Sequence, residues 1–167
     1  VFPSFALGWK IKKESFMQDV DLFSDLKLRA SYGITGNSEI PLYRSLSGFS
    51  VVNYSFNGVL VSGLAENRVP NPDLKWEQTA QFNVGLDMGF LNGRLNVNTD
   101  FFFTRTNDLL LYVALPTSSG FSTALLNSGS LENKGFEFAA DVLVIDKPGF
   151  TWNINGNFSI LRNKIIS

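Results

Sequence analysis

The sequence predicts an all-β fold: an antiparallel, up-and-down segment of about six strands from a larger transmembrane β-barrel. Three observations carry this prediction. Apolar and polar residues alternate along several stretches, which is the period of a strand with two different faces. The connections between these stretches are short and long in turn. Apolar residues make up 44% of the chain, yet no run of about 18 apolar residues occurs that would form a membrane-spanning helix.

The first two strands are expected over residues 4–11 and 26–35. Each places its apolar residues at every second position, as a half-buried strand does. The apolar faces consist of Phe5, Leu7, Trp9 and Ile11 in the first strand, and of Leu26, Leu28, Ala30, Tyr32 and Ile34 in the second. Between them, apolar residues at helix-like spacing predict a helical turn within residues 12–25.

A hairpin is expected around Asn92-Gly93, because a type I′ turn needs positive φ at both central residues. Residues 79–88 (TAQFNVGLDM) alternate strictly, and the alternation resumes after the turn with the opposite parity. If Leu91 pairs with Arg94, the two polar faces coincide and Asp87 lies opposite Asn98. Register and pattern therefore agree, as they must when one face is buried.

A second hairpin is expected from the alternating residues 135–142 and 151–160. The connection is predicted to have five residues, 145–149, with Val144 paired to Phe150. In that register Phe138 lies opposite Gly156, where its ring would cover the bare backbone.

The six strands have short links around residues 12–25, 91–93 and 145–149. The links around residues 36–74 and 107–128 are long and rich in Gly, Ser, Asn and Pro. In an antiparallel sheet alternate links lie at opposite ends. Short turns at one end and long loops at the other are typical of outer-membrane barrels, with turns in the periplasm and loops outside the cell.

Alternation alone does not distinguish a lipid-facing side from a protein core, since soluble sandwiches also alternate. Trp9, Trp76 and Trp152 fall on the apolar parity near strand ends, where an interfacial aromatic girdle sits. The strands are as long as a membrane span, and their apolar faces carry almost no central charge. These features favour a barrel wall. A soluble carbohydrate-binding β-sandwich is the alternative.

Several strings, in order, closely resemble the C-terminal barrel region of the SusC/RagA-type TonB-dependent transporters of Bacteroidota. They are LKLRASYGITGN (26–37), NPDLKWEQTAQFNVGLDMGFLNGRL (71–95), DLLL (108–111), LPTSSGF (115–121) and NSGSLENKGFEF (127–138). The resemblance makes residues 1–167 one partial barrel domain, and the start at Val1 without Met and the end at Ser167 suggest a piece of a longer protein.

The resemblance implies a barrel of about 22 strands with an N-terminal plug. It also implies energy supplied through TonB, contact with outer-membrane lipid, a SusD-like lipoprotein over the extracellular mouth, and oligosaccharide or peptide cargo. The plug, the TonB-contacting segment and the other strands would belong to the rest of the protein. Unpaired edges of this segment would pair with those other strands.

Charged residues on the polar parity are expected to face the barrel lumen, either along a substrate path or as an ordinary solvated surface. They are Lys27, Arg29, Asp87, Arg94, Asp100, Glu137 and Asp141. Aromatic residues in the long links are candidates for contact with ligand or lid protein, or for packing within their own loop. They are Tyr43, Phe49, Tyr54, Phe56 and Phe121.

Composition argues against several other functions. The chain has no Cys and no His, which excludes a disulfide scaffold, Cys/His zinc sites and a His-based triad. The acidic residues Asp19, Asp21 and Asp25 lack the spacing of a calcium loop. A net charge of -1 gives no footprint for nucleic acid. No enzymatic activity, metal or cofactor is therefore expected.

Overall fold

The computed structural model describes residues 2–37 and 40–166, which form two compact units. The first unit comprises the described parts of Val1–Thr35, together with Thr79–Thr106 and Leu131–Ile166. The second comprises those of Gly36–Gln78, together with Asn107–Ser130. Val1 and Ser167, on which the expectation of a longer protein partly rests, lie outside the described residues. No helix in the described part of the chain is long and apolar enough to span a membrane.

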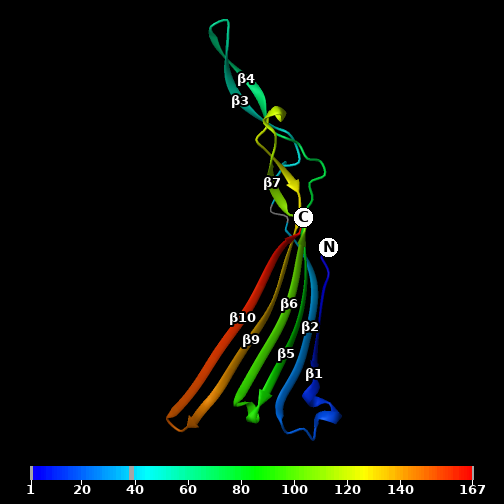
Figure 1. Cartoon of the computed structure of the whole chain (residues 1–167), viewed down its shortest axis with the longest axis vertical. Helices are drawn as coiled ribbons and strands as arrows, with labels where there is room; N and C mark the ends of the chain where they lie inside the picture. Colours follow the sequence, from blue (N-terminus) through cyan, green and yellow to red (C-terminus); the bar gives the residue numbers. More distant parts are fainter. Residues whose placement is uncertain (1, 38–39, 167) are drawn as a thin grey trace. The chain divides into compact units, whose positions relative to one another are not determined.

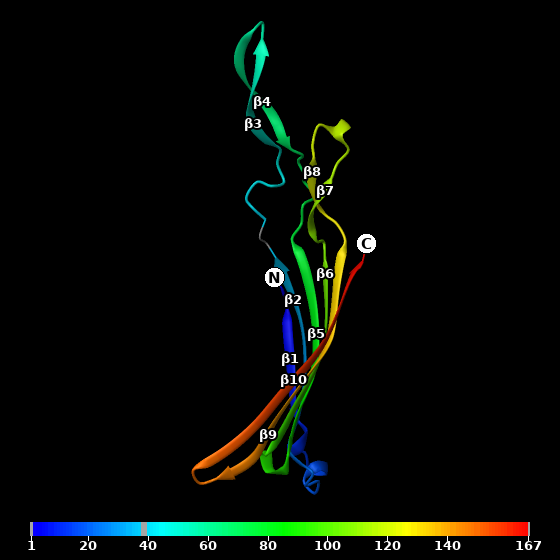
Figure 2. The ribbon, with the colours of Figure 1, turned by 60° about the vertical axis from the view of Figure 1, so that its left-hand side comes forward.

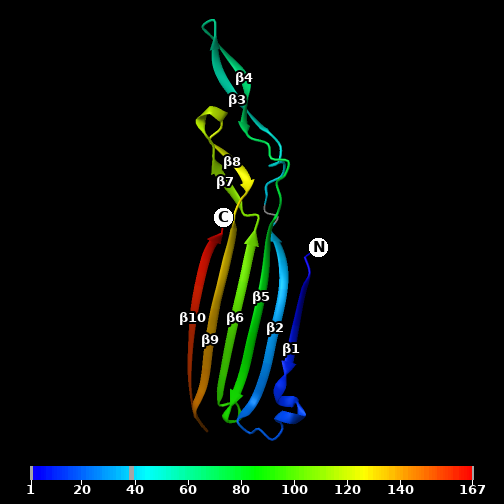
Figure 3. The ribbon, with the colours of Figure 1, turned by 45° about the vertical axis from the view of Figure 1, so that its right-hand side comes forward.

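The first unit is built on a six-stranded sheet in the order β1-β2-β5-β6-β9-β10 (Figures 1 and 3). Consecutive long strands are neighbours, so the up-and-down antiparallel prediction is confirmed. The strands are β1 (Ser4–Lys10), β2 (Phe23–Asn37), β5 (Glu77–Phe90), β6 (Leu95–Asn107), β9 (Ser130–Lys147) and β10 (Phe150–Ile166). Among the described residues, β1 and β10 are the sheet's two edges.

The pairing of β1 with β2 matches the predicted faces. Phe5 lies opposite Tyr32 with their ring centroids 5.6 Å apart, and Trp9 lies opposite Leu28. On the other parity, Gly8 lies opposite Arg29. Because side chains alternate between faces, apolar residues of both strands share one side and polar residues share the other.

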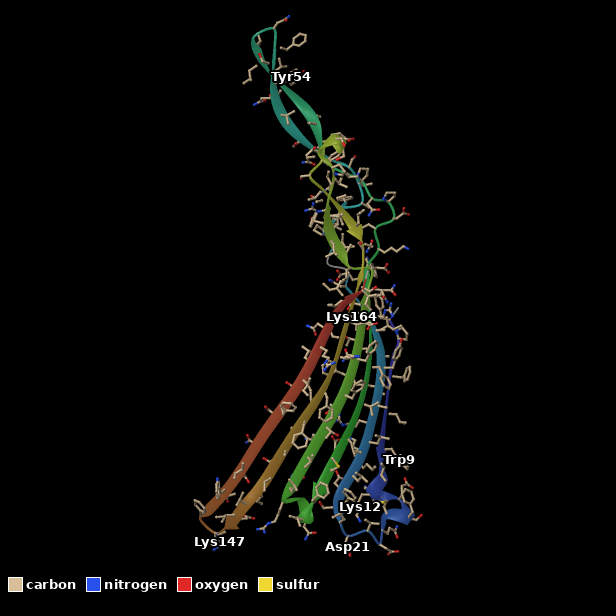
Figure 4. All side chains as sticks on the ribbon, in the orientation of Figure 1. Trp9, Lys12, Asp21, Tyr54, Lys147 and Lys164 are labelled. Carbon is tan, nitrogen blue, oxygen red and sulfur yellow. The ribbon has the colours of Figure 1, made fainter. Side chains whose placement is uncertain are left out.

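The link between β1 and β2 contains two short 3₁₀ turns, η1 (Ile11–Lys13) and η2 (Ser15–Met17), so the predicted helical turn is present in 3₁₀ form. The Lys12 Nζ donates hydrogen bonds to the carbonyl oxygens of Met17 (3.0 Å) and Val20 (2.7 Å). The Trp9 Nε1 donates to the Glu14 carboxylate at 2.9 Å. These bonds fold the link against the end of β1, where Figure 4 labels Trp9 and Lys12.

The β5–β6 connection has the positive φ angles that the Asn-Gly pair predicts, at 56° and 84°. Leu91 also has a positive φ, 53°, so the turn includes the 3₁₀ segment η3 (Leu91–Gly93) and β5 ends at Phe90. The hydroxyls of Thr79 and Thr106 are 2.8 Å apart, and the Thr99 hydroxyl donates to the Leu86 carbonyl at 3.5 Å. These contacts are those expected when Asp87 lies opposite Asn98.

The predicted five-residue connection between β9 and β10 is wrong. β9 continues through Lys147 and β10 starts at Phe150, so the link is Pro148-Gly149 alone. Proline presets its own φ and Gly149 takes a φ of 85°, which completes the turn in two residues. The register differs accordingly. A Cβ added to Gly156 would meet no atom within 4 Å, so the Phe138 ring does not cover it.

An aromatic ring does cover a glycine elsewhere in the sheet. A Cβ on Gly135 in β9 would lie 2.6 Å from the Phe102 Cζ and 2.7 Å from the Ile160 carbonyl oxygen. Phe102 belongs to the otherwise polar parity of β6. Its ring fills the space left by the missing side chain, which is the arrangement expected wrongly at Gly156.

The second unit contains two hairpins within the links that the sequence predicted to be long loops (Figure 2). β3 (Gly48–Phe56) pairs with β4 (Val59–Arg68), and β7 (Leu110–Ala114) pairs with β8 (Thr123–Asn127). A short 3₁₀ turn, η4 (Thr117–Ser119), lies between β7 and β8. The β3–β4 turn is Asn57-Gly58, with φ angles of 51° and 81°.

The two glycines give a matched test of packing in the sheet. We expect Gly135→Ala to destabilise the protein by about 1–3 kcal/mol, because the new methyl group overlaps Phe102 and the β10 backbone. Gly156→Ala meets open space and should be neutral or slightly stabilising. The temperature at which each variant loses its folded, heat-modifiable band on a gel measures the difference. Equal behaviour of the two variants would show that the Phe102 ring does not constrain Gly135.

Candidate functional site

An ion network links three strands on the polar side of the sheet. The Arg29 guanidinium in β2 donates from Nε to the Asp87 Oδ2 at 2.9 Å and from Nη2 to the Asp87 Oδ1 at 2.8 Å. The same Nη2 donates to Asp100 Oδ2 at 3.0 Å. The paired bonds to Asp87 have the fork geometry that makes arginine–carboxylate contacts strong and directional. The side chains of Arg29, Asp87 and Asp100 are 38%, 27% and 31% exposed.

Gly85 makes this network possible. β5 lies between β2 and β6, so Arg29 must reach across β5 to meet Asp100. A Cβ on Gly85 would clash with the Asp100 carboxylate and would lie 2.6 Å from the Arg29 Nη2. The missing side chain therefore leaves a notch through which the guanidinium and the carboxylate meet.

The polar face continues from Asp100 toward β10. Asp100, Glu137, Asn98, Asn157 and Ser159 line an open concavity of about 370 Å³. Asp141 lines a neighbouring concavity with Asn98 and Asn155. Carboxylates and amides converge here, and such groups accept and donate hydrogen bonds to polar molecules.

Six of the seven predicted lumen residues share this polar face. Lys27 lines a concavity with Arg29 and Asp100, and it lies opposite Lys10. Arg94 is the exception, because it follows the η3 turn outside the strands. Its backbone carbonyl accepts a hydrogen bond from the Leu143 N–H at 2.7 Å.

The three tryptophans are exposed and lie near strand ends, as predicted. Trp9 is the second-last residue of β1, Trp152 is the third residue of β10, and Trp76 immediately precedes β5. The apolar parity is exposed along the sheet, including Phe5, Leu7, Phe101 and Phe158. Contact of these side chains with lipid stays a prediction.

The loop aromatics concentrate in the β3–β4 hairpin, where Figure 4 labels Tyr54. Phe49, Tyr54 and Phe56 are 59%, 51% and 65% exposed, so their own loop covers less than half of each. Tyr54 lies opposite Val61 and Phe56 opposite Val59, and the Tyr54 ring lies close to the Gly63 backbone. Tyr43 is also exposed, whereas Phe121, which follows η4, is half-buried.

A group of polar side chains ties the long links together, and the sequence reasoning missed it. The Asn127 side-chain amide accepts from the Lys75 N–H and donates to the Lys75 and Asp108 carbonyls, all within 2.9 Å. The Glu77 carboxylate accepts from the Asn37 amide at 3.0 Å and from the Leu110 N–H at 2.9 Å. These residues stand in the strings that carry the family resemblance. Those strings therefore contain the residues that hold the ends of the long links together by hydrogen bonds.

Long antiparallel strands with one polar and one apolar exposed face define a class, the wall of a β-barrel. A family model described as TonB dependent receptor-like, beta-barrel, matches residues 1–165, and the chain belongs to this family.

Named relatives agree with that assignment. TonB-dependent receptor P26 of Formosa agariphila is 41% identical over 165 residues, which cover 99% of this chain and 17% of the relative. TonB-dependent receptor SusC of Bacteroides thetaiotaomicron is 42% identical over 172 residues, with 98% and 17% covered. The solved structure of the RagAB peptide transporter matches with a TM-score of 0.85 at 36% identity, covering 98% of this chain and 18% of its own. The SusC/RagA resemblance is thus confirmed, and the chain spans 17–18% of the length of these relatives.

The ion network predicts coupling between strands that are not neighbours. We expect Arg29→Gln and Asp100→Asn each to destabilise the protein, and the double variant to cost about 1 kcal/mol less than the sum. The coupling is small because the side chains are about one-third exposed and water screens them. A double-mutant cycle on the free energy of unfolding measures it. Additive losses would mean that the two groups do not interact across Gly85.

Proposed function

We propose that this chain forms part of the wall of an outer-membrane, TonB-dependent transporter that imports oligosaccharides or peptides. The observation that carries the proposal is the two-faced sheet of a TonB-dependent receptor family member. Its apolar parity is exposed, and its polar parity holds an ion network and two open concavities. A wall between lipid and a water-filled lumen needs such a sheet, since neither face then requires a protein core.

In this proposal Lys27, Arg29, Asp87, Asp100, Glu137 and Asp141 face the lumen. The side chains of Phe5, Leu7, Phe101 and Phe158 meet the hydrocarbon. Trp9 and Trp152 lie at the membrane boundary near the short connections, and Trp76 lies near the long ones, as interfacial tryptophans do. The long connections with their hairpins then face the outside of the cell.

The cargo and partners proposed for the whole transporter are supported by similarity to its relatives. SusC and the RagAB peptide transporter are both similar to this chain over nearly its full length. A SusD-like lipoprotein at the outer mouth, a plug inside the barrel and energy from TonB would complete the machine. The chain contributes wall and loops, and it performs no chemistry on the cargo.

The β3–β4 hairpin is suited to contact the lipoprotein. Residues 49–65 carry no charge, and both faces of the hairpin expose large apolar side chains. Exposed apolar patches of this kind mark surfaces that bind other proteins. Aromatic anchors such as Tyr54 and Phe56 dominate the free energy of such interfaces.

Cysteine scanning tests the orientation of the sheet. The chain itself has no cysteine, and any cysteine elsewhere in the full transporter is first replaced by serine. In the full transporter in lipid vesicles, a fluorophore on Phe101→Cys should be quenched by spin-labelled lipid acyl chains. Asn98→Cys, on the opposite parity of the same strand, should instead react with a small water-soluble thiol reagent.

Phe158→Cys and Asn157→Cys give the same comparison on β10 and serve as the matched pair. Equal lipid quenching at Phe101 and Asn98 would contradict a two-faced wall. A protein that is soluble without detergent and shows no lipid quenching would favour the carbohydrate-binding sandwich instead.

Substitutions in the hairpin test the contact with the lipoprotein. We expect Tyr54→Ala with Phe56→Ala to weaken co-purification of the lipoprotein by at least about tenfold, because two aromatic anchors are lost. Ser55→Ala, on the other parity of β3, should leave co-purification unchanged. Intact complex in the aromatic double variant would mean that this face of the hairpin does not carry the contact.

A further inference from the structure

A cluster of cations interrupts the apolar face at the end where the long connections leave the sheet. Glu132 and Lys134 in β9 and Arg162 and Lys164 in β10 line one concavity of about 310 Å³. Their even numbers put them on the same parity as Phe136, Phe158 and Ile160, the apolar side of these strands. Figure 4 labels Lys164 near the end of β10, away from Lys147 at the β9–β10 turn.

A contact with β6 supports the position of this cluster on the apolar side of the sheet. The Arg105 Nη1 lies 3.5 Å from the Glu132 carboxylate. Arg105 has the same parity as Phe101 and Phe103, whereas Asp100 on the other parity lines the polar concavity with Glu137. The apolar and polar parities thus remain on opposite faces of the sheet up to this end of β6 and β9.

The cluster carries excess positive charge. Glu132 is its one carboxylate, and Arg105 already engages that group. Within residues 2–37 and 40–166, no other carboxylate forms a salt bridge with Lys134, Arg162 or Lys164. Three exposed cations around one concavity repel one another, so an anion bound there lowers their free energy.

The surroundings indicate what kind of anion this is. A strand added beyond β10 would extend the sheet sideways and would leave this face open. Phe136, Phe158 and Ile160 are exposed on the same face, which is the apolar face that the proposed function places against hydrocarbon. A ligand that matches both the cation cluster and the apolar face beside it carries a phosphate group attached to acyl chains. Juxtamembrane clusters of Lys and Arg bind anionic lipid headgroups in this way.

We propose that Lys134, Arg162 and Lys164 bind the phosphate of a phosphorylated lipid in the outer leaflet of the membrane. The acyl chains of this lipid would lie along the apolar side of β9 and β10. The proposal rests on the proposed function, because it needs the apolar face to be in a membrane and the long connections to be outside the cell. It adds a binding site on the outer wall of the barrel, separate from the polar face.

The test compares two charge-neutral triple variants of the full transporter in nanodiscs. The first is Lys134→Gln, Arg162→Gln and Lys164→Gln. The matched control removes the same charge at the opposite end of the sheet: Lys10→Gln, Lys13→Gln and Lys147→Gln. The probe is bisphosphorylated lipid A, with fully dephosphorylated lipid A and inorganic phosphate as comparison ligands, and native mass spectrometry measures the bound fraction.

Each lost cation should weaken binding of bisphosphorylated lipid A about fivefold, and the first triple variant on the order of 100-fold. The control variant and the wild type should bind alike, and dephosphorylated lipid A should bind weakly to all. The single variant Lys164→Gln, at an exposed position, should lose about fivefold and keeps the test decisive if the triple variant misfolds.

Three results would overturn the proposal. Equal binding of bisphosphorylated lipid A by the first triple variant and the control would show that the cations are solvated and do not bind the lipid. Equal binding of dephosphorylated lipid A would show that acyl chains alone are recognised. Displacement of lipid A by inorganic phosphate would assign the cluster to free phosphate. Failure of the proposed function is distinguished by fractionation, because the wild-type protein would then be missing from the outer membrane.

Discussion

The period of two along each strand is the constraint on which the rest of the sheet depends. Among the described residues, Ala124 in β8 is the one apolar residue classed as buried, so the six-stranded sheet has no core of its own. Its side chains are held instead by cross-strand contacts on two faces. A slip of one residue between β2 and β5 would turn Arg29 toward the apolar side and separate it from Asp87. Register therefore determines charge placement and lipid compatibility together.

Two glycines show how the polar face is held without a core. At Gly85 the empty space lets Arg29 meet Asp100 across an intervening strand, and at Gly135 it receives the Phe102 ring. The first contact joins β2, β5 and β6, and the second joins β6 to β9. Together they span the middle of the sheet. Such satisfied contacts limit the motion of the side chains on the polar face, which the proposed wall of a transporter would require.

Much of this arrangement was predictable from residues alone. The parity reversal across Asn92-Gly93 predicted the β5–β6 register. The two-residue period placed six charged candidates on the polar face of the sheet, and their exposure to a lumen stays a prediction. The β9–β10 turn was wrong because β9 continues through Asp146 and Lys147 although its alternation ends before them, and Pro148-Gly149 completes the turn without further residues. The network at Gly85 was missed because it depends on two registers at once, and no pattern within a single strand encodes it. Phe102 was missed because it is apolar on a polar parity.

The β3–β4 hairpin was missed because its strands lack the alternation of apolar and polar residues. Asn57-Gly58 is the same turn signal as Asn92-Gly93, but the flanking residues are apolar at consecutive positions, as in Val51-Val52 and Val59-Leu60-Val61. A strand between lipid and water needs one polar face, whereas a strand between two protein surfaces does not. The cations at the ends of β9 and β10 depart from the two-residue pattern in the opposite way, because charged residues occupy positions on the apolar parity. The first departure lies in a separate two-stranded sheet, and the second lies at the ends of two strands of the six-stranded sheet. Each departure carries one of the two proposed contacts, the hairpin with the lipoprotein and the cations with a phosphorylated lipid.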